Sequence, residues 1–216
     1  MAKSMNRWQR LFAAALACAA LAASAQELEP GKDYGVVTPP QKTDDPSKIV
    51  VIEFFSYACP HCNAFNPSLT LWENRLAKDV HFEREAVIFG RQPWQKLAQV
   101  YYALQVIGKA EQLNPSIYGA LHVERVNWQT DADIIAWMAA HGVNREEFAA
   151  AFNSFSMRTY VTRGDQLATA YQVRAVPWII VDGKYSFPIA DNGDFPSQLA
   201  MVDRLIEKVR VERKQP

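Results

Sequence analysis

Seven consecutive residues that favour a buried strand lead almost directly into a pair of cysteines. The run Ile49–Phe55 is apolar, β-branched or aromatic except for Glu53, as is typical of a central strand covered on both faces. The tetrapeptide Cys59-Pro60-His61-Cys62 follows a short connection, and apolar side chains then recur at helical spacing. Pro60 suits the first turn of a helix, where its missing N–H costs no hydrogen bond. The sequence therefore predicts a strand, a turn bearing two thiols, and a helix that begins at the motif.

Two thiols at this spacing can close into one disulfide or supply half of a zinc site. A zinc site needs two more ligands, and there is no second Cys-x-x-Cys pair. The histidines at 81, 122 and 141 show no metal-ligand spacing with each other or with the cysteines. We therefore expect no metal and no bound cofactor, and we expect the Cys59–Cys62 pair itself to carry redox chemistry.

The first 25 residues have the composition of a secretory signal peptide. Three basic residues precede an apolar run over Leu11–Leu21, which is too short to span a bilayer, and small residues follow up to Ala25. Cleavage after about Ala25 removes Cys18, which leaves Cys59 and Cys62 as the only thiols of the exported chain. The predicted compartment is the periplasm, which is oxidising and permits disulfides.

The charge balance of the exported chain argues against a nucleic-acid partner. The full sequence has 23 basic and 23 acidic residues, and the predicted signal peptide contains three basic and no acidic ones. The remainder, 20 basic against 23 acidic residues, carries a formal charge of −3 and has no basic block.

The short loop between Cys59 and Cys62 bears on the role of the two thiols. A structural disulfide closing so short a loop would add little stability, which favours a chemical role for the two thiols.

The elements after residue 25 occur in the order β-α-β, a helical block, then β-β-α. The second strand is expected over Val80–Phe89, and Asp182-Gly183 is a strong hairpin signal before the last helix, which starts at Phe195. We predict an α/β, thioredoxin-like fold formed by residues 26–89 and 173–216. Residues 90–172 are predicted to form an all-helical domain inserted into it.

Four segments in this order resemble the DsbA family of thiol:disulfide oxidoreductases. They are Glu53-Phe54-Phe55-Ser56, then Cys59-Pro60-His61-Cys62, then Val176-Pro177 before a strand, and finally the hairpin Asp182-Gly183-Lys184-Tyr185. The resemblance covers nearly all of the chain after the predicted signal peptide. A Cys-Pro-His-Cys motif combined with a distant Val-Pro is far more specific than a Cys-x-x-Cys pair alone.

The resemblance implies distinct roles for the motif residues. Cys59, at a helix N-terminus, would be a strongly acidic thiol that attacks or is attacked, and Cys62 would be buried and act second. His61 would add positive charge or a hydrogen-bond donor beside Cys59, although an incidental surface histidine is the alternative. Pro60 forms, with His61, the dipeptide between the two cysteines, and we assign it to the catalytic residues together with Cys59, His61 and Cys62.

Three further residues are assigned to the site by the resemblance. Val176 and Pro177 would form a cis-proline loop that faces the disulfide and pairs with an extended substrate chain, the alternative being an ordinary trans proline at a strand start. Glu53 would be a buried acid that relays a proton near Cys62, the alternative being a side chain that points into solvent.

The function implied is donation of the Cys59–Cys62 disulfide to reduced or unfolded exported proteins through a mixed disulfide. The resemblance also implies a monomer that is reoxidised by a quinone-linked membrane partner of the DsbB type. Two alternatives remain open on the sequence: a disulfide isomerase or reductase of the same fold, and a non-catalytic peptide-binding chaperone.

Overall fold

The computed structural model describes residues 28–214, so the predicted signal peptide lies outside the described residues. The chain divides into two compact units, residues 1–34 and 35–216. The described part of the first unit is a turn in which the Gly31 N–H donates to the carbonyl oxygen of Tyr34 at 2.7 Å. None of the helices in the described range is long and apolar enough to cross a membrane.

The second unit is built on a five-stranded sheet with strand order β1-β5-β4-β2-β3. Its strands are β1 (Gly35–Val36), β2 (Ile49–Phe55), β3 (Val80–Ala86), β4 (Trp178–Val181) and β5 (Tyr185–Pro188). Strand β2 has the predicted bounds and runs parallel to β3, whereas its pairing with β4 is antiparallel. All seven residues of β2 are buried, Glu53 included, as expected for a strand covered on both faces.

The predicted hairpin joins β4 to β5. Asp182 and Gly183 have φ angles of 55° and 66°, both in the left-handed region, and lie in the tight turn that separates the paired residues Val181 and Tyr185. A side chain at Gly183 would also place its Cβ 2.1 Å from the backbone oxygen of Gln41, so glycine is needed there on both counts. This hairpin prediction is confirmed.

Helices surround the sheet and fill the chain between β3 and β4. They are α2 (Pro60–Glu73), α3 (Gln92–Val106), α4 (Ala110–Tyr118), α5 (Asp131–Ala140), α6 (Arg145–Phe152), α7 (Ser156–Ala170) and α8 (Phe195–Lys214), with a π-helical turn, Gly119–Val123, after α4. Helix α5 begins with a capping box in which Thr130 and Asp133 bond reciprocally. The Asn144 side chain accepts from the Glu147 N–H at 2.9 Å and so caps α6.

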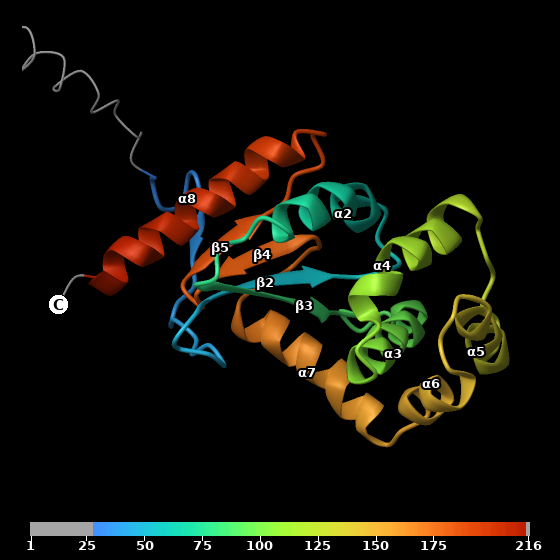
Figure 1. The fold of residues 1–216 in the computed structure, drawn as a ribbon. Helices are drawn as coiled ribbons and strands as arrows, with labels where there is room; N and C mark the ends of the chain where they lie inside the picture. Colours follow the sequence, from blue (N-terminus) through green and yellow to red (C-terminus); the bar gives the residue numbers. More distant parts are fainter. Residues whose placement is uncertain (1–27, 215–216) are drawn as a thin grey trace, which may run out of the picture. The chain divides into compact units, whose positions relative to one another are not determined.

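Figure 1 shows α2 and α8 on one face of the sheet and α7 on the other, with α3 to α6 beyond the carboxyl ends of β2 and β3. Val50, Ile52 and Phe54 of β2 pack in one cluster with Tyr171, just after α7. Since side chains alternate along a strand, Glu53 lies on the opposite face, toward α2. The thioredoxin-like fold with a helical insertion is confirmed, whereas the domain boundaries at residues 89/90 and 172/173 stay predictions.

Candidate active site

The Cys-Pro-His-Cys motif lies at the junction between β2 and α2, as the sequence predicts. Cys59 is the N-cap of α2, with an extended backbone at φ −88° and ψ 118°, and Pro60 occupies the first turn. The Cys59 carbonyl accepts the first helical bond from the Asn63 N–H at 3.1 Å. Because the first N–H groups of a helix have no acceptor within the helix, those at the start of α2 can stabilise negative charge on the Cys59 sulfur.

The Cys59 thiol is made acidic by its neighbours. A hydrogen bond from the Cys62 side chain is the largest cause, and the backbone N–H groups of Cys62 and His61 and the His61 charge act in the same direction. Burial opposes these effects, and together they lower the pKa of Cys59 to about 6. A thiol with this pKa is mostly thiolate at neutral pH.

Cys62 has the opposite character, although it is only one turn away. It is fully buried, whereas Cys59 is 8% exposed. Burial raises the pKa of Cys62 well above that of an ordinary thiol, and the negative charges of Cys59 and Glu53 raise it further. Both cysteines are free thiols in this structure. One motif therefore holds a slightly exposed thiolate and a fully buried thiol that donates a hydrogen bond to it.

We expect the ultraviolet absorbance of the thiolate in the reduced protein to titrate with a midpoint near pH 6. Replacing Cys62 with alanine removes the strongest stabilising hydrogen bond, so the midpoint should move to higher pH. The matched blank is Cys59→Ser, whose absorbance should show no step in this range. A wild-type midpoint near pH 9, the value of an unperturbed thiol, would contradict the assignment.

The Val176-Pro177 loop lies beside the first cysteine. The peptide bond between these residues is cis, which confirms the prediction made from the resemblance. The Cys59 Sγ is 3.5 Å from the carbonyl oxygen of Val176. The Pro177 carbonyl oxygen accepts from the Ile189 N–H at 3.2 Å, which ties the loop to the end of β5. The fold thus brings two segments far apart in the sequence to the same sulfur atom.

His61 is half-exposed and has a carboxylate partner that sequence reasoning did not identify. Its Nε2 lies 2.9 Å from Oδ2 of Asp191, in the loop between β5 and α8. The buried side chain of Gln198 on α8 holds this loop in place. The Gln198 Oε1 accepts from the Ala190 N–H at 2.6 Å, and its Nε2 donates to the Asn192 side chain at 2.9 Å. His61 therefore has a carboxylate partner at 2.9 Å, and its role beside Cys59 stays a prediction.

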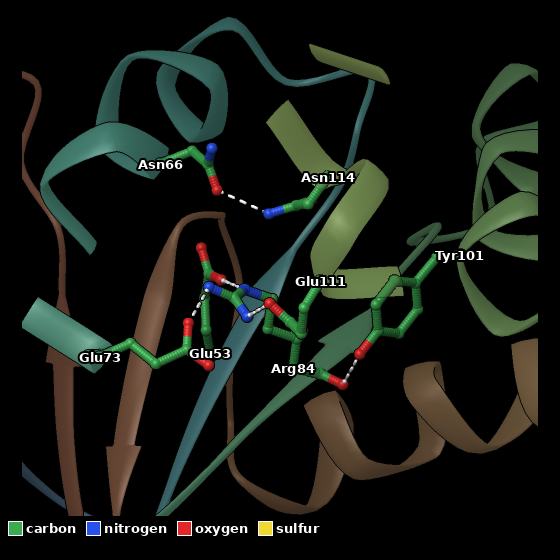
Figure 2. A network of polar contacts seen from close by, with 7 residues as sticks. All are labelled: Glu53, Asn66, Glu73, Arg84, Tyr101, Glu111 and Asn114. Atoms are coloured by element: carbon green, nitrogen blue, oxygen red, sulfur yellow. Dashed lines mark hydrogen bonds and ion pairs between the residues drawn. The ribbon is translucent and has the colours of Figure 1, made fainter. Parts of the chain in front are cut away.

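Glu53 is buried and belongs to a cluster of charged groups around Arg84 (Figure 2). The Arg84 Nε donates to Glu53 at 3.0 Å and its Nη2 donates to Glu73 at 2.8 Å, while Nη1 donates to Glu111. Burial raises the pKa of Glu53 to about 7, even though Arg84 opposes this effect. The solvent-pointing alternative for Glu53 is therefore wrong, and its carboxyl group takes up or loses a proton near neutral pH.

Sequence reasoning missed Arg84, Glu73, Glu111 and Asp191. A signal existed for the first of these, since Arg84 interrupts a second strand directly beside β2. Glu53 and Arg84 are register partners in the parallel pair, and a buried charge requires a partner of opposite sign. Within residues 28–214 no group of three or more His, Cys, Asp or Glu side chains is arranged to hold a metal ion.

Comparisons with known proteins agree with this geometry. A family model described as DSBA-like thioredoxin domain matches residues 50–200. The thiol:disulfide interchange protein DsbA of Pseudomonas aeruginosa is 36% identical over 207 residues, which cover 94% of this chain and 98% of that protein. The protein of the same name from Bordetella parapertussis is 36% identical over 203 residues, covering 93% and 95%.

Solved structures give the same result. The crystal structure of Pseudomonas aeruginosa DsbA superposes with a TM-score of 0.82 at 35% identity, covering 88% of this chain and 99% of that one. That of the oxidoreductase DsbA from Xylella fastidiosa has a TM-score of 0.76 at 29% identity, with coverage of 85% and 98%. With its redox-motif geometry and these similarities over most of its length, this chain belongs to the DsbA-like thioredoxin domain family.

Proposed function

We propose that this protein is a thiol:disulfide oxidoreductase that donates its Cys59–Cys62 disulfide to newly exported proteins. The observation that carries the proposal is the contrast between the two thiols of one motif. The pKa of Cys59 is lowered to about 6 and that of Cys62 is raised well above the ordinary value. Such a pair releases one sulfur readily as a thiolate and keeps the other protonated.

In the first step, a client thiolate attacks the Cys59 sulfur of the oxidised enzyme. A bond forms between the two sulfurs, the Cys59–Cys62 bond breaks, and its electron pair goes to Cys62. Because the pKa of Cys62 is high, this sulfur takes up a proton, and Glu53 is the nearby buried acid with a pKa of about 7. Attack at Cys59 rather than Cys62 is favoured because Cys62 is fully buried.

In the second step, another client thiolate attacks the client sulfur of the mixed disulfide. The client leaves with a disulfide, and Cys59 departs as a thiolate. A lowered pKa makes Cys59 a good leaving group, since thiols of lower pKa leave faster. The client loses two electrons and the enzyme gains them, so the reduced Cys59/Cys62 pair is the product form of the enzyme.

The direction of electron flow follows from which form of the enzyme is stabilised. Hydrogen bonds from the Cys62 side chain and from the backbone of α2 stabilise the Cys59 thiolate, which exists only in the reduced form. Stabilising the reduced form makes the disulfide a stronger oxidant. This argument favours an oxidant over an isomerase or reductase. It also disfavours a non-catalytic chaperone, for which acidic and protonated thiols would have no use.

Partners and compartment complete the proposal. The clients are reduced or unfolded exported proteins, and Val176 and Pro177 would align an extended client segment beside Cys59. Each cycle leaves a reduced enzyme, so turnover needs an oxidant, and family membership supports a quinone-linked membrane protein of the DsbB type. The predicted signal peptide supports a periplasmic protein, and we propose that it acts as a monomer without any cofactor beyond its own disulfide.

The proposal is tested by equilibrating the protein with reduced and oxidised glutathione and counting its free thiols. We expect a potential well above the value of about −270 mV that is typical of thioredoxin. The double variant Cys59→Ser/Cys62→Ser has no redox pair and serves as the blank. A potential close to that of thioredoxin would favour the reductase alternative and contradict the proposed direction of transfer.

A further inference from the structure

A single guanidinium group joins three parts of the fold around the Glu53 carboxylate. Arg84 on β3 directs one nitrogen to Glu53 on β2, another to Glu73 on α2 and the third to Glu111 on α4 (Figure 2). The Arg84 side chain is 1% exposed. Glu111 lies on α4, one of the inserted helices. A residue outside the thioredoxin-like strands therefore contributes to the charge around Arg84 and Glu53.

The cluster holds more negative than positive charge when all its members are ionised. Three carboxylates surround one guanidinium, which leaves a formal excess of negative charge around the buried side chains of Arg84 and Glu53. Like charges at this range disfavour simultaneous ionisation, so one carboxyl group tends to keep its proton. The Glu53 side chain is 3% exposed, against 26% for Glu73 and 58% for Glu111, so Glu53 is the group that keeps it.

The other groups that act on Glu53 come from each neighbouring element. Besides Arg84 and the two glutamates, the ionisable side chains electrostatically coupled to Glu53 are Cys62 on α2, Tyr118 on α4 and Tyr57 just after β2. Burial raises the pKa of both tyrosines, so they are neutral at physiological pH. The proton on Glu53 is therefore governed by Arg84, Glu73, Glu111 and the charge of Cys62.

We propose that Glu111 is a positioning residue for disulfide transfer, because by binding one nitrogen of Arg84 it keeps Glu53 able to carry the proton that Cys62 takes up. When the Cys59–Cys62 bond breaks, its electron pair goes to Cys62 and the proton passes from Glu53 to that sulfur. Glu53 is left ionised and paired with Arg84. This inference rests on the proposed function, since it concerns the first step of that reaction.

The effect of removing the Glu111 charge has a definite sign. Glu111 is one of the charges that raise the pKa of Glu53, whereas Arg84 lowers it. Glu111→Gln therefore removes a repulsion and leaves more of the Arg84 charge to stabilise the ionised form of Glu53. The pKa of Glu53 falls, and at neutral pH a smaller fraction of the enzyme holds the proton.

The experiment compares wild type with Glu111→Gln, the conservative variant Glu111→Asp, and Glu124→Gln. Glu124 is an exposed residue just after the π-helical turn, so its change matches the loss of charge at a distance from Arg84. The Glu53 carboxyl carbon is titrated by ¹³C NMR in each oxidised protein. In parallel, opening of the disulfide by a small dithiol is measured against pH and expressed per attacking thiolate.

For wild type we expect a Glu53 midpoint near pH 7 and a rate per thiolate that falls as pH rises through it. In Glu111→Gln both midpoints should move down by about one pH unit, which lowers the rate at pH 7 by about fivefold. Glu111→Asp should restore most of the wild-type profile, and Glu124→Gln should leave it unchanged. Glu73→Gln, an independent variant, should shift the profile in the same direction.

An unchanged Glu53 titration in Glu111→Gln would overturn the inference, as would an equal shift in Glu124→Gln. These outcomes are separate from failure of the proposed function. In that case wild type itself would not transfer its disulfide to a client, whatever the titration of Glu53. A general loss of structure in Glu111→Gln would lower the rate at every pH, whereas the inference requires a displaced profile.

Discussion

Cys59→Ser is expected to lose disulfide transfer to client proteins by at least about three orders of magnitude. The substituted enzyme cannot form the bond that the client thiolate breaks, and its remaining thiol is buried with a pKa raised well above the ordinary value. Formation of disulfides in a reduced client, followed by alkylation of its remaining thiols, measures the loss. Normal client oxidation by this variant would show that the motif is not the redox centre.

The matched variant Cys62→Ser should fail in a different way. It retains Cys59, whose thiolate can attack a disulfide of an oxidised client and form a mixed disulfide as one client sulfur leaves as a thiolate. No Cys62 sulfur is then available to attack Cys59 and release the client. We therefore expect covalent enzyme–client adducts that are absent from Cys59→Ser and that disappear on reduction. Comparing the two variants separates the attacked sulfur from the buried one. Equal adduct formation by both would contradict the proposed order of attack.

Arg84→Met should destabilise the protein by about 3–5 kcal/mol, because it leaves the buried Glu53 carboxyl without its counter-charge. The free energy of unfolding in urea measures this loss. Arg75→Met is the matched control, since Arg75 makes an exposed ion pair with Asp203 at 3.6 Å and should change stability by no more than about 1 kcal/mol. Equal losses for the two variants would contradict the structural importance of the buried cluster.

The loss in Arg84→Met should also depend on pH. The pKa of Glu53 is raised in the folded protein, so its contribution to stability is full below the unfolded value of about 4.5 and is lost as pH rises through about 7. Removing Arg84 raises the folded pKa further. The difference in unfolding free energy between wild type and Arg84→Met should therefore be smaller near pH 5 than near pH 8. A pH-independent difference would point to lost packing alone.

Local patterns were sufficient to predict the elements that carry the thiols. The apolar content of Ile49–Phe55, broken only by Glu53, predicts a central strand, and Pro60 at the first turn predicts where the next helix begins. Asp182 and Gly183 adopt the positive φ angles that a tight hairpin requires. These features depend on backbone preferences of a few neighbouring residues, which is why they can be read from sequence.

The electrostatic surroundings of the thiols could not be predicted in the same way. Asp191 meets His61, and Glu111 meets Arg84, only because the folded chain brings a loop and an inserted helix to the motif. Neither acidic residue has a distinctive sequence pattern, and charged side chains of this kind usually lie in solvent. The predicted end of the second strand at Phe89 is also wrong, because β3 ends at Ala86. Beyond that end, the Ile88 N–H donates to the Asp165 side chain at 2.8 Å instead of to a neighbouring strand.

The hydrogen bonds by which Gln198 holds the loop around Asp191 have a consequence for the Cys59–Cys62 disulfide. They affect how its oxidising strength can be adjusted during evolution or by design. Through the loop that bears Asp191, this buried α8 residue fixes the carboxylate facing His61, whose charge in turn lowers the pKa of Cys59. The four motif residues are under direct chemical constraint, whereas position 198 is not. Substitutions in the last helix therefore offer a means of retuning the redox centre while its reactive atoms stay the same.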